Sequence, residues 1–190
     1  GQDQSQNSET GFLIDTRTGT LDGFMSQSAV GQAFVEGAMY LDGLLMPGLS
    51  FAQLRKDAWL HMHFETLNPY DDDINLMSRS NSGDANNVQG ALKGKVAEAW
   101  LWAEKLHASQ VAVIARGFNF MAPPMAALGF WPTEEGQGDS LFDFLDEADT
   151  SKWAKLLNGP AWVYQDVPPQ AGWHPEMIIS PPPPSPPPPP

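Results

Sequence analysis

Residues 91–116 read ALKGKVAEAWLWAEKLHASQVAVIAR, and the predicted architecture rests on them. This is the longest stretch of the chain in which apolar residues recur at the 3.6-residue period of an α-helix. One stripe of the helical wheel holds Leu92, Val96, Trp100, Ala103, His107 and Ile114. The opposite face carries Lys95, Glu98, Trp102, Lys105 and Ser109. We therefore expect a central helix, with Trp100 in the core and Trp102 at the surface.

Three further segments have helical patterns and recognisable helix ends. They are residues 29–45, residues 50–67 and a stretch from Ser140 to Asn158. Ser28, Ser50 and Ser140 are the expected N-caps, and Ser50 with Gln53 forms a capping-box pattern. The third helix is expected to break at Asp149-Thr150 or to continue through it. We interpret three glycines in the first segment as sites of close packing against another element: Gly31, Gly37 and Gly43. The proline-interrupted residues 118–132 are expected to be irregular chain.

These patterns predict a mainly α-helical, single-domain head of about four or five helices. A polar N-terminal arm and turn region (1–27) precedes the helical head (28–160), and residues 12–14 suit a short strand or an anchor. A neck rich in proline and tryptophan (161–179) follows, and the chain ends in a polyproline rod (180–190).

Composition excludes several classes of function. The net charge is −13 with only 10 Lys and Arg, which argues against nucleic acid and anionic membrane surfaces as partners. No apolar run is long enough to span a membrane, and cysteine is absent. The chain begins at Gly1 and not at Met, so we expect that a signal peptide has been removed. No Asn-x-Ser/Thr sequon occurs, so any glycan is expected to be O-linked.

The final residues, 180–190, read SPPPPSPPPPP. Proline fixes φ and lacks an N–H, so this run joins neither a helix nor an internal strand. It is expected to form a polyproline II rod, which rises about 3.1 Å per residue and has no internal hydrogen bonds. We expect this rod to be held by contacts with protein or glycan.

This tail resembles the Ser-Pro repeats of extensin-type hydroxyproline-rich glycoproteins of green algae and plants. The resemblance covers residues 180–190 only and implies a component of a wall, an extracellular matrix or a surface appendage. It also implies hydroxylated prolines with short glycans, and sugars on the serines. The implied modification sites are Ser180, Pro181, Pro182, Pro183, Pro184, Ser185, Pro186, Pro187, Pro188, Pro189 and Pro190. Proline-rich tails also occur as SH3 or WW ligands and as linkers, which usually include basic or aromatic residues that this tail lacks.

One pair of residues is a candidate for metal binding. Glu104 and His107 have the i,i+3 spacing of a carboxylate–imidazole pair on a helix. Di-iron sites of that type need a second such pair and two more carboxylates, which the sequence lacks. We favour a core role for His107, and no catalytic residue and no cofactor are predicted.

Aromatic residues suggest a binding surface. Seven tryptophans occur in 190 residues, and flat aromatic rings bind both polyproline II helices and sugars. The candidates for contact with polyproline or glycan are Trp102, Trp162, Tyr164 and Trp173.

Together these features predict an extracellular structural glycoprotein that is not an enzyme. Its expected partners are copies of itself or other matrix glycoproteins, with O-linked glycans. Two alternatives remain: a secreted metal-dependent oxidoreductase that uses Glu104 and His107, and a carbohydrate-binding module, each anchored by the tail.

Overall fold

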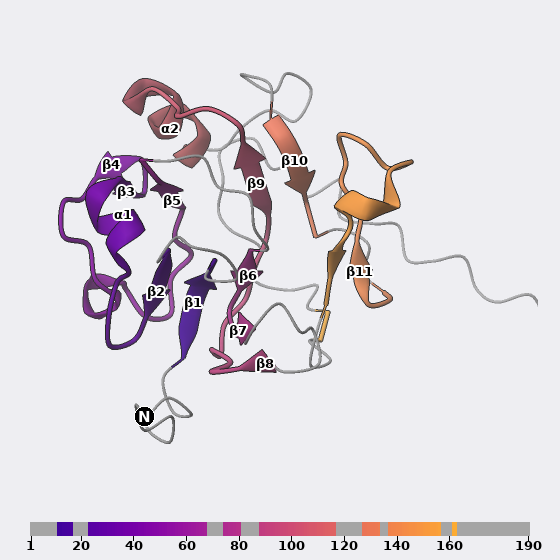
Figure 1. Ribbon diagram of the computed structural model, residues 1–190, viewed down its shortest axis with the longest axis horizontal. Helices are drawn as coiled ribbons and strands as arrows, with labels where there is room; N and C mark the ends of the chain where they lie inside the picture. Colours follow the sequence, from indigo (N-terminus) through magenta and orange to yellow (C-terminus); the bar gives the residue numbers. More distant parts are fainter. Residues whose placement is uncertain are drawn as a thin grey trace, which may run out of the picture.

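The computed structural model describes residues 11–16, 23–67, 74–80, 88–116, 127–133, 137–156 and 161–162. Within these ranges the fold is mainly β, with twelve short strands and two α-helices (Figure 1). The predicted mainly α-helical head of four or five helices is therefore wrong.

The strands form two three-stranded sheets and three two-stranded pairs, all antiparallel within the described part of the chain. One sheet has the order β2 (Phe24–Ser26), β1 (Phe12–Asp15), β6 (Asn75–Leu76). The other has the order β4 (Leu44–Leu45), β3 (Ala38–Leu41), β5 (Met62–Glu65). The pairs are β7 (Arg79–Ser80) with β8 (Val88–Gln89), β9 (Ala99–Trp102) with β10 (Ala127–Trp131), and β11 (Ser140–Leu141) with β12 (Ala154–Lys155). The helices are α1 (Gln32–Glu36) and α2 (Ala108–Ala115), with 3-10 turns η2 (Phe51–Gln53) and η3 (Thr150–Lys152).

The predicted helix over residues 29–45 is replaced by the short helix α1 and the β3–β4 hairpin. Asp42 and Gly43 form the hairpin turn, and both have positive φ, 51° and 79°. Two positive φ values in a two-residue loop match the twist of the strands that it joins, and Asp-Gly favours such a turn. Gly37 ends α1 where the chain passes close to β5, because a Cβ there would lie 1.9 Å from the Glu65 carbonyl oxygen. The close packing expected at this glycine is present, although the helix around it is not.

The predicted central helix over residues 91–116 divides into strand β9 and helix α2. Trp100 and Trp102 are two residues apart, so they share one face of β9, whereas a helix would place them on different faces. Trp100 lies opposite Phe130 of β10, and their rings stack with centroids 3.7 Å apart. This cross-strand contact between bulky aromatic residues favours a strand over the helical pattern. The helix begins only at Ala108, after the N-cap residue His107.

The remaining predicted helices are also wrong. Residues 50–67 form the 3-10 turn η2 and strand β5, although Gln53 does accept a hydrogen bond from the Ser50 backbone N–H, as in a capping box. The stretch that begins at Ser140 forms β11, η3 and β12. Residues 118–132, expected to be irregular, contain strand β10.

Strand β3 lies between two hydrophobic cores, because its successive side chains point to opposite faces. Met39 belongs to the first core with Ile14, Met25, Phe34 and Leu49. Tyr40 belongs to the second core with Leu106, Val111 and Ile114, against which Trp102 packs. The β9–β10 pair lies beside this second core, and β11 and η3 follow at the far side of the molecule from α1 (Figure 1). None of the helices in the described ranges could cross a bilayer.

Candidate functional site

The two residues of the predicted metal pair do not share a helix. Glu104 lies in the bend after β9, whereas His107 caps the N-terminus of α2, and both side chains are exposed. The Ser109 backbone N–H donates to His107 Nδ1 at 3.3 Å, and the Ser109 hydroxyl lies 2.8 Å from the same nitrogen. Among the residues that the structure describes, no group of three or more His, Cys, Asp or Glu side chains is arranged to hold a metal ion. The geometry therefore adds no support to the oxidoreductase hypothesis.

Trp102 is half-buried, and not exposed among charges as its helical position predicted. Its ring stacks on Trp100 with centroids 5.6 Å apart and an angle of 9° between the planes. The other side meets the edge of the His63 ring, at 5.8 Å between centroids. A row of ring contacts thus crosses from the second core to the surface, through Tyr40, His63, Trp102, Trp100, Phe130 and Phe144. Trp102 therefore takes part in the packing of this row, and its contact with polyproline or glycan stays a prediction.

Trp162, the second predicted contact residue, lies beside the last described strands. Its indole Nε1–H donates to the Gly138 carbonyl at 3.3 Å. Tyr164, Trp173 and all the tail residues 180–190 lie outside the described residues. The hydrogen bond to Gly138 therefore places Trp162 next to the segment that follows this glycine.

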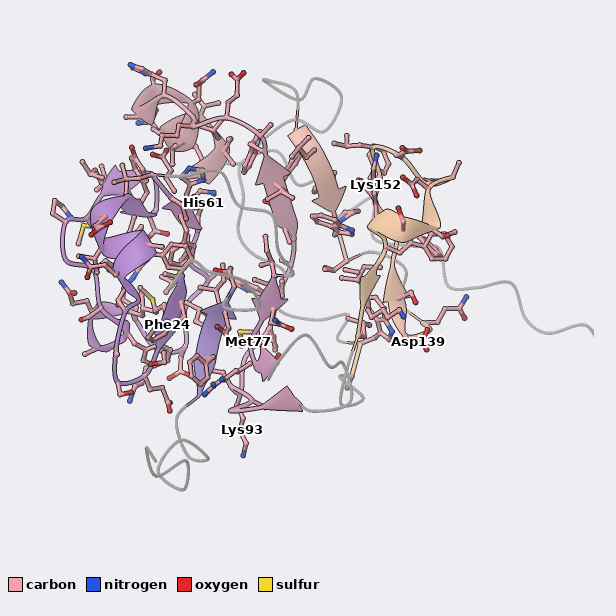
Figure 2. All side chains as sticks on the ribbon, viewed as in Figure 1. Phe24, His61, Met77, Lys93, Asp139 and Lys152 are labelled. Carbon is pink, nitrogen blue, oxygen red and sulfur yellow. The ribbon has the colours of Figure 1, made fainter. Side chains whose placement is uncertain are left out.

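Together with Gly138, that segment forms residues 138–156, which we call the strap. The strap contains β11, η3 and β12 and runs along β10 (Figure 1). Figure 2 labels two residues of the strap, Asp139 just before β11 and Lys152 in η3. In this view both lie far from Phe24, which belongs to the first sheet. Three tryptophans donate their indole N–H groups to strap carbonyls: Trp131 to Lys152, Trp153 to Glu147, and Trp162 to Gly138, at 3.0, 3.3 and 3.3 Å. These bonds fix the orientation of each indole.

Asp143 attaches the strap to β10. Its side chain is fully buried, and Oδ1 accepts hydrogen bonds from the backbone N–H groups of Phe130 at 2.9 Å and Leu145 at 3.0 Å. The Phe144 N–H donates in turn to the Phe130 carbonyl at 2.8 Å. The carboxylate and the Phe144 amide thus provide partners for the N–H and C=O groups of Phe130, as a neighbouring strand would. The second oxygen, Oδ2, is buried and has no hydrogen-bond partner among the described residues.

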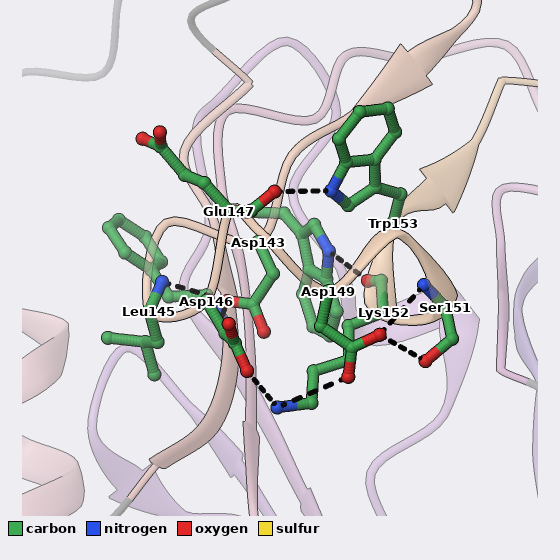
Figure 3. Close-up of polar contacts among 10 residues, drawn as sticks. Asp143, Leu145, Asp146, Glu147, Asp149, Ser151, Lys152 and Trp153 are labelled. Atoms are coloured by element: carbon green, nitrogen blue, oxygen red, sulfur yellow. Dashed lines mark hydrogen bonds and ion pairs between the residues drawn. The ribbon is translucent and has the colours of Figure 1, made fainter.

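Charged side chains close the second turn of the strap. The Lys152 ammonium lies 2.8 Å from Asp146 Oδ2 and 3.9 Å from Asp149 Oδ2, between the two carboxylates (Figure 3). Hydrogen bonds from the Ser151 hydroxyl and backbone N–H lower the pKa of Asp149, and the hydrogen bond to Asp146 raises the pKa of Lys152. Exposed ion pairs of this kind contribute little stability, so we assign them a role in the shape of the turn.

The strap exposes apolar side chains in spite of these attachments. Phe142, Phe144 and Leu145 are 41, 53 and 39% exposed. The Phe142 ring meets Trp153 edge-on, with centroids 4.4 Å apart and 65° between the planes. Gly129 of β10 leaves room for the Trp131 ring, because a Cβ there would lie 2.5 Å from the ring edge. The strap therefore presents ring surfaces that are held in place by its backbone.

A second cluster contains the buried His63 on β5 and the half-buried His61 just before that strand. His63 and Glu65 are each 9% exposed, and His63 Nε2 lies 3.2 Å from Glu65 Oε1. Burial, with a smaller contribution from the neighbouring His63, lowers the pKa of His61 to about 4. Burial also lowers the pKa of His63, although Glu65 opposes the shift. Burial thus disfavours the charged form of both imidazoles, and at His63 the contact with Glu65 offsets part of this effect.

No protein-family model, no curated protein and no solved structure matches this chain.

The sequence pattern does not predict the strap, because Ser140 and the acidic residues after it resemble the start of a helix. The alternation Leu141, Asp143, Leu145 could have indicated an extended segment, and Phe142 with Phe144 could have indicated an aromatic face.

Proposed function

We propose that this chain is an extracellular structural subunit that assembles with copies of itself or with similar glycoproteins. In this proposal the strap of one subunit binds the polyproline tail of another. One observation carries the proposal: the strap exposes Phe142 and Phe144 beside a tryptophan that is already oriented, in a chain that also contains the run 180–190.

The geometry suits a polyproline II ligand. Such a helix offers pyrrolidine rings that stack on flat aromatic faces, and it is already ordered before it binds, so the entropy loss is small. The indole N–H groups of Trp131 and Trp153 are bonded to strap carbonyls, so only the rings of these residues remain for contact with the ligand. Binding through them would depend on apolar stacking and little on salt.

Charge favours the same ligand. The strap carries Asp139, Asp143, Asp146, Glu147 and Asp149 against Lys152 and Lys155. An acidic peptide would be repelled by this excess of carboxylates, whereas residues 180–190 have no charged side chain. Short glycans on the tail, which its resemblance to extensin-type repeats implies, would extend the contact beyond the rings. An intact mass above the 20.7 kDa of the bare chain would support such glycans.

The test is assembly of the full-length chain. Sedimentation velocity over a concentration series that extends into the millimolar range should show oligomers of the native chain at the upper end of the series. A full-length variant in which the tail prolines are replaced by alternating Gly and Ser should remain monomeric, because its tail is no longer a preformed rod. Ser180→Ala with Ser185→Ala, which keeps every proline, is the matched control. Equal assembly of the native chain and the Gly/Ser variant would contradict the proposal.

A further inference from the structure

We propose that, before assembly, the strap is covered by the polyproline tail of its own chain. This inference rests on the proposed function, since it concerns the same surface. It adds that the tail of the same chain covers the strap in an isolated subunit. It also adds that this cis contact determines the subunit concentration at which assembly begins.

The first argument is the exposure of the strap. Three neighbouring residues, Phe142, Phe144 and Leu145, each expose at least 39% of their surface. Groups of large apolar side chains on soluble proteins usually mark a contact site. Asp143 accepts hydrogen bonds from the backbone N–H groups of Phe130 and Leu145, so the backbone that carries these side chains is attached to β10.

The second argument is the point at which the chain leaves the strap. The hydrogen bond from Trp162 to Gly138 places residue 162 at the first residue of the strap. Eighteen residues, 163–180, separate it from the first proline of the run. Fully extended they would span roughly 60 Å, and as a flexible coil roughly 20–25 Å, so the rod can return to the strap.

The third argument is local concentration. A ligand joined by a linker of this length has an effective concentration in the millimolar range, far above that of free subunits in dilute solution. The strap and tail of one chain should therefore find each other first. Exchange between chains then requires a density of tails that exceeds this effective concentration, as in a packed matrix. Cis binding would thus delay assembly until subunits accumulate.

The experiment uses the absence of cysteine from the chain. Ser185→Cys gives one attachment point for a spin label in the middle of the rod, with every proline kept. In a chain that is both ¹⁵N-labelled and spin-labelled, at concentrations where sedimentation shows a monomer, the indole N–H signals of Trp131 and Trp153 should broaden. In a mixture of ¹⁵N chains without a spin label and spin-labelled chains without ¹⁵N, the same signals should stay sharp.

Two variants of the spin-labelled full-length chain complete the test. Phe142→Ser with Phe144→Ser should abolish the broadening, because both side chains are exposed ligand contacts. Leu44→Ser, at a 68% exposed position on β4, should leave it unchanged. Sharp signals in the doubly labelled monomer, or broadening that appears only in the mixture, would overturn cis binding. If assembly is still observed by sedimentation in that case, only this inference fails, and the proposed function stands.

Discussion

Asp143 and Phe130 are joined by a hydrogen bond of 2.9 Å from the Phe130 backbone N–H to the Asp143 carboxylate. The bond is buried and connects the strap to β10. The Phe130 side chain, on the same strand, stacks on Trp100 in the aromatic row. The position of the exposed rings therefore depends in part on one buried acidic side chain, together with the hydrogen bond from the Phe144 N–H to the Phe130 carbonyl.

Asp143→Ala should lower the free energy of unfolding by about 2–4 kcal/mol, because two buried backbone N–H groups lose their acceptor. Asp143→Asn should cost no more than half of that, since its side-chain oxygen can accept both bonds. Urea unfolding of the two full-length variants measures the difference. Equal losses would show that the carboxylate charge, and not its role as an acceptor, holds the strap.

Trp102→Ala should destabilise the protein by roughly 3 kcal/mol or more, about as much as Trp100→Ala, because each removes a large ring from the same stack. The helical pattern of residues 91–116 predicts the opposite, a small cost at Trp102. Val113→Ala, at a 53% exposed position on α2, serves as the control and should change stability by about 0.5 kcal/mol or less. A loss at Trp102 as small as that at Val113 would contradict the stacked arrangement.

Acid should weaken the fold between about pH 6.5 and pH 4. The pKa of His61 is lowered from 6.5 to about 4 in the folded chain, so the unfolded chain binds more protons in this interval. In the folded chain His61 stays neutral down to about pH 4, whereas in the unfolded chain it takes up a proton below about pH 6.5. The stability that the neutral imidazole contributes is therefore complete above pH 6.5 and is lost as the pH falls toward 4. The full effect of the shift at His61 would be about 3 kcal/mol. His63 should add to the loss in the same direction, because its pKa is also lowered.

Unfolding curves at several pH values between 7.5 and 4.5 measure this dependence. His61→Gln should flatten it, whereas His107→Asn, an exposed position where asparagine also serves as an N-cap, should not. A native chain whose stability is constant from pH 7 to pH 4.5 would rule out buried neutral imidazoles at this cluster.

Local signals in the sequence were more reliable than the architecture built from them. Phe12 lies in a strand, as residues 12–14 allowed, and Gln53 accepts a hydrogen bond from Ser50 as the capping box predicted. The helical period failed at Trp100 and Trp102, because contacts across to Phe130 and His63 outweigh intrinsic preference in so short a segment. Asp42-Gly43 is a hairpin signal in the sequence, whereas the helical pattern of residues 29–45 predicts only close packing at Gly43. The strap could not be predicted from single residues, because Asp143 acquires its role only when β10 lies beside it.

The most direct test of the central claim is to map where the tail binds. A benzophenone attached through Ser185→Cys in the full-length chain can be photo-crosslinked and the products located by mass spectrometry. The account predicts crosslinks to peptides from residues 138–156, and their loss in the variant with Phe142→Ser and Phe144→Ser. Crosslinks concentrated instead on the exposed surface around Leu44 and Val113, or unaffected by the strap substitutions, would contradict it.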